Sequence, residues 1–167
     1  LEFYGDEVTA KRAAVFKEHK TFKKGIRAFF KKIFDSYKDP SCPKGCLLSN
    51  SISPELSNDP ELFEFIKNEI VQFELFFTQQ IQSAIESGEL DQDMESKLTA
   101  SLLVTYIQGL MRLDNLKVPV SKLKKQTDLY LKNKYETEII KYKNKIENFN
   151  SNTETTSEIK AEIQFTK

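Results

Sequence analysis

The chain has 167 residues and equal numbers of basic and acidic side chains, 25 of each, so its formal net charge is zero at pH 7. A neutral chain gives no general reason to expect binding to nucleic acid or to a membrane surface, and this length suits a single domain with its own hydrophobic core. The charge is unevenly spread, because both ends carry a basic excess while residues 50–100 carry an acidic excess.

The apolar runs and the cysteine content of the chain indicate its cellular location. No run approaches the ~18 consecutive apolar residues of a membrane-spanning helix, and no charged-then-apolar leader is present. The two cysteines, Cys42 and Cys46, are too few for the disulfide framework of a small secreted domain. We therefore expect a cytoplasmic protein without a membrane segment. Because the chain begins inside an amphipathic pattern and not with Met, we also expect that its natural beginning is missing.

Apolar residues recur at helical spacing between boundaries marked by Gly and Pro, which predicts an all-α domain. A first helix is expected to end near Glu18. A second is expected over residues 22–37, with an aromatic face and lysines elsewhere. After Gly45 a short helix is expected over residues 46–52, because Pro54 disturbs its continuation.

The clearest helix start in the chain is Asp59-Pro60. The Asp59 carboxylate can accept hydrogen bonds from first-turn amides, and Pro60 lies where no amide donor is needed. A long helix is expected from there to Gly88, which supplies a left-handed C-terminal residue. Its continuous apolar face consists of Leu62, Ile66, Ile70, Phe73, Phe77, Ile81 and Ala84.

Asp93 is expected to cap the next helix, whose apolar face, widened by Leu103 and Ile107, consists of Met94, Leu98, Leu102, Tyr106, Leu110 and Leu113. Pro119 is expected to begin another, with Leu123, Leu131 and Tyr135 inside. From Tyr135 the apolar spacing becomes a heptad, and residues 159–165 alternate as a strand would. We therefore predict a domain over residues 1–134 and a C-terminal extension over residues 135–167.

Thirteen phenylalanines and no tryptophan make the expected helices unusually rich in Phe. Most of these rings are expected in the core, and the others are expected to line a cavity to which Gln80, Tyr106 and Gln108 add polar groups. A core without any cavity is the alternative. The candidate ligand-binding residues are Phe29, Phe30, Phe34, Cys46, Phe73, Phe77, Gln80 and Tyr106.

The sequence offers little for catalysis. Cys46 could be a sensing thiol at a helix start or a small packed apolar residue, and His19 lies among charged neighbours typical of a surface. Paired Glu-x-x-His motifs, nucleophile elbows and phosphate-binding loops are absent. We therefore predict a protein that is not an enzyme and that needs neither a metal nor another cofactor.

Three segments in order carry a family resemblance: Gly45-Cys46-Leu47-Leu48, Asp59-Pro60-Glu61 and Gly88-Glu89-Leu90. With this spacing, residues 1–134 resemble the C-terminal, ligand-binding half of TetR/AcrR-family transcription regulators. The resemblance implies an all-α bundle of about six helices, which agrees with the helical periodicity of the sequence. Nothing in the chain resembles the helix-turn-helix that precedes this half in the family.

The resemblance also implies partners. It predicts a small apolar or aromatic effector, a homodimer, and operator DNA bound only through the missing N-terminal domain. Gly109, inside a helix where Gly costs about 1 kcal/mol, fits either close approach at a dimer seam or packing within one chain. The family dimerises through its last two long helices, which here gives the candidate interface residues Leu102, Tyr106, Gly109, Leu113, Leu123 and Leu131.

Two functions are therefore open. The first is the effector-sensing and dimerisation domain of a TetR-family regulator, expected to be a repressor. The second is a stand-alone helical protein-interaction module with a solid core. Small molecules that raise the melting temperature would distinguish the first from the second.

Overall fold

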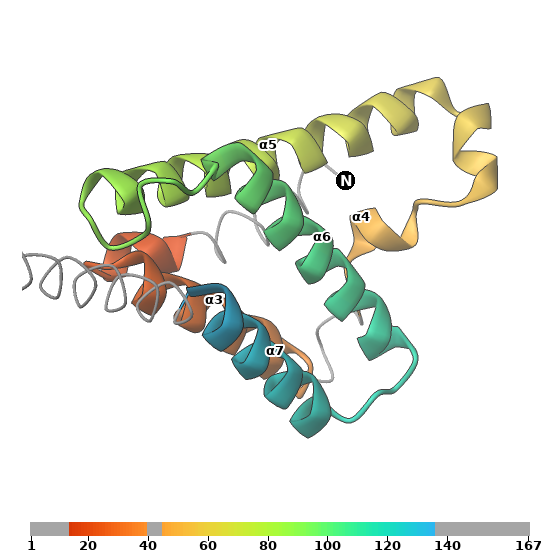
Figure 1. Ribbon diagram of the computed structural model, residues 1–167. Coiled ribbons are helices and arrows are strands. Elements are labelled where there is room, and N and C mark those ends of the chain that lie inside the picture. The colour runs from red at the N-terminus through yellow and green to blue at the C-terminus, as the bar shows by residue number, and fades with distance from the viewer. Residues whose placement is uncertain (1–13, 40–44, 136–167) are drawn as a thin grey trace, which may run out of the picture. The chain divides into compact units, whose positions relative to one another are not determined.

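The computed structural model describes residues 14–39 and 45–135, and all regular structure in these ranges is helical (Figure 1). The predicted fold class is therefore confirmed. The expected heptad and strand patterns of residues 136–167 lie outside the described residues, as does Cys42. The elements are the 3₁₀ helices η2 (Ala14–Glu18) and η3 (Pro54–Asn58) and the α-helices α3 (Phe22–Ser36), α4 (Leu47–Asn50), α5 (Pro60–Glu86), α6 (Ser96–Asn115) and α7 (Val120–Tyr135).

The chain divides into two compact units, Leu1–Asp128 and Leu129–Lys167, with the division inside α7. In the second unit only residues 129–135 are described, and there Leu131 and Tyr135 are buried while Leu129 is exposed. The predicted domain boundary at residue 134 stays a prediction.

Helix α3 forms as its sequence predicts. Thr21 has extended backbone angles and its hydroxyl accepts a hydrogen bond from the Lys24 amide at 3.4 Å, which begins the helix. The helical spacing places an apolar face inward and leaves Lys24, Lys31 and Lys32 exposed. The buried residues of this face are Phe22, Ile26, Phe29, Phe30, Ile33 and Phe34.

The segment before α3 is a tight 3₁₀ turn within the described residues, where an α-helix was expected. It ends at Glu18, as predicted. Phe16 in this turn is buried against Gly25 of α3, so close that a Cβ atom at position 25 would lie 2.5 Å from the Phe16 ring. Glycine at position 25 thus permits the η2–α3 corner to pack tightly.

Helix α5 begins and ends where the sequence predicts. The Asp59 side chain accepts a hydrogen bond from the Leu62 amide at 3.0 Å, and Pro60 is the first helical residue. At the other end, Gly88 has φ of +74°, the left-handed conformation that terminates helices. Helix α5 then packs along α6, and Glu74 of α5 accepts a hydrogen bond from Ser101 of α6 at 2.9 Å.

The start of α6 was predicted wrongly. The helix begins at Ser96, and Asp93 does not cap it. Instead, the Asp93 amide donates to the Asp91 carboxylate at 3.0 Å, because a short acidic side chain can hold a local turn as readily as a helix end.

The inward face of α6 agrees with the expected one only in part. Leu103, Ile107 and Leu110 are buried as expected, whereas Leu98 and Leu102 are half exposed. Both sides of α6 carry leucine, so the apolar pattern alone does not fix which side meets the core.

Candidate functional site

Six of the eight candidate ligand-binding residues are brought together by α3, α5 and α6. We call Phe29, Phe30, Phe34, Phe73, Phe77 and Tyr106 the aromatic cluster. Phe29 is central: its ring centroid lies 5.5 Å from that of Phe77 and 6.1 Å from that of Phe73. Phe30 extends the cluster to Tyr106 at 5.9 Å, mostly in edge-to-face contacts that aromatic rings favour.

The aromatic cluster is closely packed. Phe29 and Phe77 have no exposed surface, and Phe30 is 2% exposed. Phe16, which was not among the candidate site residues, joins from η2 with its ring 5.9 Å from Phe77. A small molecule that contacts Phe29 or Phe77 would therefore have to displace a neighbouring side chain.

Tyr106 forms the polar edge of the cluster. Its hydroxyl and the Thr127 hydroxyl share a hydrogen bond of 2.9 Å. Burial is the main reason that the pKa of Tyr106 is raised, and the Asp128 charge adds to it, while the bond to Thr127 acts in the opposite direction. The phenol is therefore neutral at physiological pH. Nearby, the Lys124 ammonium lies 5.8 Å from the centre of the Phe34 ring, a favourable cation–π distance.

Cys46 lies apart from these ring contacts, in the turn that leads into α4. Gly45 before it has φ of +72°, and the Gly45 amide donates to the buried Asp114 carboxylate of α6 at 3.4 Å. The Cys46 thiol is free and buried. The Gly-Cys-Leu-Leu segment thus connects the start of α4 to the end of α6. Its glycine permits the left-handed backbone conformation of this turn.

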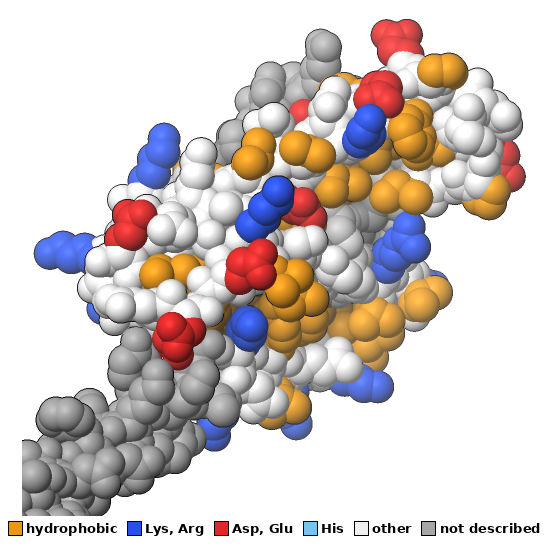
Figure 2. Space-filling view, turned by 45° about the horizontal axis from the view of Figure 1, so that its top comes forward, with side chains coloured by type: hydrophobic (Ala, Val, Ile, Leu, Met, Phe, Trp, Pro, Cys, Tyr) orange, Lys and Arg blue, Asp and Glu red, His pale blue; other side chains and the backbone are white. Residues whose placement is uncertain are grey.

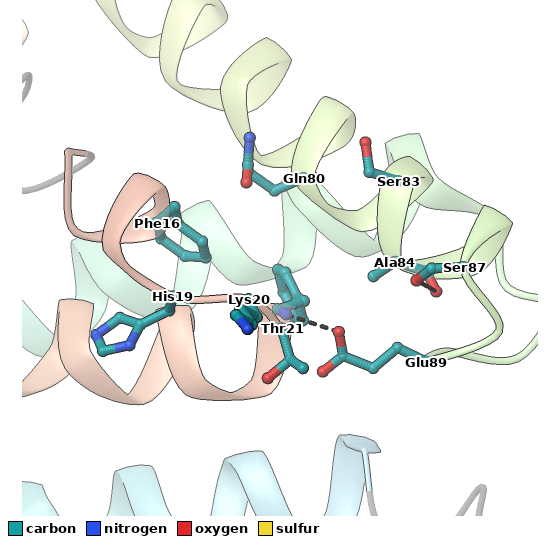
Figure 3. Close-up of a pocket in the computed structure, with 10 residues that line it drawn as sticks. Phe16, His19, Lys20, Thr21, Gln80, Ser83, Ala84, Ser87 and Glu89 are labelled. Carbon is teal, nitrogen blue, oxygen red and sulfur yellow. Dashed lines mark hydrogen bonds between the residues drawn. The ribbon is translucent and has the colours of Figure 1, made fainter.

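Gln80 lies outside the aromatic cluster and lines a hollow of about 200 Å³ between the C-terminal part of α5 and the start of α3 (Figure 3). We call it the polar hollow. Its walls include Lys20, Gln80 and Ser83, and Phe16 and Phe22 add apolar surface. His19 also lines it and is partly exposed, so the expected surface position of this residue is only partly reached. The Gly88-Glu89-Leu90 segment contributes Glu89, whose side chain extends toward Thr21 (Figure 3).

Gln108 of α6 has a buried side-chain oxygen without a hydrogen-bond partner among the described residues. Buried acceptors are rarely unpaired, because an unmade hydrogen bond costs free energy. A donor from water or from a bound molecule would satisfy this oxygen.

The candidate dimer residues occupy two kinds of position. Leu102 is 50% exposed, Gly109 is exposed, and Tyr106 and Leu113 are half-buried. Leu123 of the first unit and Leu131 of the second are both buried.

A row of exposed apolar side chains follows one side of α6. Leu98 is 54% exposed, and Leu116, just past the helix end, is 74% exposed. With Leu102 and Gly109 these residues recur at intervals that keep them on one face, which we call the α6 stripe. A Cβ atom at position 109 would meet nothing within 4 Å, so nothing in the described structure packs against this glycine.

Other chemistry is not indicated within residues 14–39 and 45–135. No three His, Cys, Asp or Glu side chains gather there in a way that could hold a metal ion. The helices in these ranges lack the combination of length and apolar character that crossing a bilayer requires.

Comparison with known families adds the decisive observation: residues 23–125 match the family described as Tetracyclin repressor-like, C-terminal domain. The chain belongs to this family. The match contains all three signature segments and every residue of the aromatic cluster, and it confirms the TetR resemblance. The TetR family consists of transcription regulators and is not an enzyme family.

A solved structure agrees with the TetR assignment. A TetR transcriptional regulator from Chloroflexus aurantiacus J-10-FL is similar with a TM-score of 0.63 and 19% sequence identity. The alignment covers 78% of this chain and 65% of that regulator, and at this identity the similarity concerns the fold alone. Comparison with curated proteins gave no match.

Proposed function

We propose that this chain is the effector-sensing and dimerisation domain of a TetR-family transcriptional repressor. A small apolar or aromatic molecule would bind at the aromatic cluster and control DNA binding by a helix-turn-helix segment N-terminal to this domain. The observation that carries the proposal is the aromatic cluster itself, which joins three helices by ring contacts inside the region that matches the family.

The chemistry of the cluster supports an apolar ligand with one or two polar atoms. The rings offer apolar surface, and the Tyr106 hydroxyl, which bonds to Thr127, adds a polar group at their edge. Because Phe29 and Phe77 have no exposed surface, a ligand that contacts them requires an arrangement in which a neighbouring side chain has moved. A ligand that binds that arrangement more tightly than the closed one would shift the population toward it.

The experiment is a thermal-shift screen of the full chain with a library of small apolar and aromatic molecules. We expect some of them to raise the melting temperature of the wild type, because a ligand that binds only the folded state stabilises it. Phe30→Leu should lose this shift while it keeps the fold. Phe63→Ala should retain the shift, because Phe63 is 43% exposed on α5 and lies outside the cluster.

A second function has support in two observations, the absence of exposed surface on Phe29 and Phe77 and the exposed apolar residues of α5. Phe63, Val71 and Leu75 are each more than 40% exposed, and hydrophobic side chains reach the surface over the right-hand part of α5 (Figure 2). These features would suit a helical interaction module with a solid core. No melting shift across the library would contradict effector sensing and favour this alternative.

We further propose that the chain forms a homodimer through the α6 stripe. The stripe exposes leucine on both sides of Gly109, and the open space at Gly109 would let a second backbone approach closely. A second copy covering this surface would remove apolar area from water, at roughly 25 cal/mol for each Å².

A further inference from the structure

The first turn of α3 receives a carboxylate from a distant part of the chain. The Glu89 side chain, in the loop between α5 and α6, accepts hydrogen bonds from the Phe22 and Lys23 amides, both at 2.7 Å. We call these two bonds the Glu89 clasp. The partners are 66 and 67 residues apart in sequence, so the clasp is a tertiary contact and not a local cap.

The clasp completes the hydrogen bonding of this helix end. The Lys24 amide is taken by the Thr21 hydroxyl, and the Gly25 amide by the Thr21 carbonyl at 3.0 Å. The first-turn amides of a helix have no intrahelical partner, and a negative charge there also meets the positive end of the helix dipole. Two of the first three amides of α3 therefore depend on Glu89.

Another set of contacts holds the same corner to α5. Phe16 of η2 lies 5.5 Å from the Phe76 ring centroid in an edge-to-face contact, and its ring covers Gly25. The η2–α3 corner is thus attached to α5 by apolar packing at Phe16 and to the α5–α6 loop by the clasp. Of these two attachments, the clasp is polar and only part-buried.

The clasp also has room to open. Glu89 lines the polar hollow of about 200 Å³, next to Thr21 and Lys20 (Figure 3). Its side chain could leave the α3 amides by rotating into this space, without displacing a packed ring. The amides that it leaves would then face the hollow, where water can replace the carboxylate.

We infer that the Glu89 clasp is a conformational joint: it fixes the η2–α3 corner to the α5–α6 loop, and its opening loosens that corner, which Phe16 still packs against α5, while α5 and α6 stay packed. Glu89, in the Gly-Glu-Leu signature, thus links the α5–α6 loop to the segment that leads toward the N-terminal end of the chain. The joint is a property of this domain and does not depend on effector binding or on dimerisation.

The test is hydrogen exchange of the full chain, resolved by residue, for Glu89→Ala, Glu89→Gln and the control Glu86→Ala. Glu86 is an exposed carboxylate three residues away that accepts a hydrogen bond from Gln82 of its own helix. In Glu89→Ala we expect exchange at the Phe22 and Lys23 amides to be about tenfold faster, the size that loss of a bond to a charged group implies.

The distribution of the change decides the outcome. If the clasp is a joint, exchange in Glu89→Ala is faster in residues 14–25 and unchanged in α6. The acceleration is smaller in Glu89→Gln, which keeps one acceptor oxygen. Glu86→Ala exchanges like the wild type. Unchanged exchange at Phe22 and Lys23 in Glu89→Ala would overturn the proposal. Equal acceleration in α5 and α6 would overturn it too, since Glu89 would then support the whole fold and not one corner.

Discussion

Phe77 is a fully buried ring at which η2, α3 and α5 meet. Its ring contacts those of Phe16, Phe29, Phe73 and Phe76 and has no exposed surface. Phe77→Ala should therefore lower the free energy of unfolding by about 3–5 kcal/mol, the cost of removing a buried ring and leaving a cavity. Urea denaturation followed by circular dichroism measures this loss.

Phe63→Ala is the matched control, since it removes the same ring from the same helix at a position that is 43% exposed. The free energy of unfolding should fall in Phe63→Ala by less than half of the loss in Phe77→Ala. Equal losses for the two variants would show that the ring contacts of Phe77 do not stabilise the fold as its burial implies.

Tyr106 gives a prediction at alkaline pH. Because burial raises the pKa of Tyr106 above its ordinary value of 10.0, the folded chain keeps the phenolic proton at a pH where the unfolded chain has lost it. The resulting stability is complete below pH 10.0 and declines as the pH rises through the unfolded and then the folded pKa.

Tyr106→Phe should remove this contribution to the alkaline decline, which a series of unfolding curves between neutral and alkaline pH would measure. At neutral pH it should cost about 1 kcal/mol, because Thr127 loses its partner. An alkaline decline identical to that of the wild type would contradict the assignment.

The spacing of the sequence identified the rings of the aromatic cluster, but it did not identify the residues that surround them. The rings of α3 and α5 repeat at helical intervals, so their common faces could be inferred from spacing. Phe16 was missed as a site residue because a 3₁₀ turn does not continue the helical period and its contacts are distant in sequence. Gln80 and Cys46 were grouped with the rings, but the structure places them at the polar hollow and at the α4 turn.

At the scale of elements, the signature glycines can be compared directly. Gly45 and Gly88 both have positive φ, a conformation that costs an alanine about 1–2 kcal/mol. A Cβ atom at position 45 would also lie 2.6 Å from the Asn115 side chain, whereas position 88 has nothing within 4 Å. Gly45→Ala should therefore destabilise the protein more than Gly88→Ala.

Chemical denaturation of both variants tests this order. The extra loss in Gly45→Ala would come from displacement of Asn115, whose amide also donates to Asn50 at 2.6 Å. The same loss in both variants would mean that Asn115 moves aside freely and that the turn before α4 is not tightly held by α6.

Helix boundaries could be predicted from the sequence where the residue at the boundary had a single plausible local role. Asp59-Pro60 and Gly88 were predicted correctly for this reason. Asp93 was predicted wrongly because its neighbour Asp91 offers a competing turn, and η3 was not expected because Pro54 indicated only an ending. The inward face of α6 was predicted only in part, since the helix has apolar residues on both sides and the expected face included the exposed Leu98 and Leu102.

At the scale of the whole molecule, the α6 stripe gives a reason for that double pattern: one side of α6 meets the core, and we propose that the other meets a second copy. Gly109 supports this interpretation, because a glycine in a helix costs about 1 kcal/mol and nothing in the described structure requires one there. Gly109→Ala should therefore leave a single chain as stable or more stable, while it weakens association. Thermal unfolding at low concentration checks the first part.

The most direct measurement is sedimentation velocity of the wild type and of Gly109→Glu at micromolar concentration. Glutamate is a good helix former and has open space at this position in a single chain, but it would place a charge in the proposed seam. We predict a dimeric wild type and a monomeric, folded Gly109→Glu. A wild type that sediments as a monomer would contradict this prediction, as would a Gly109→Glu dimer as tight as the wild type.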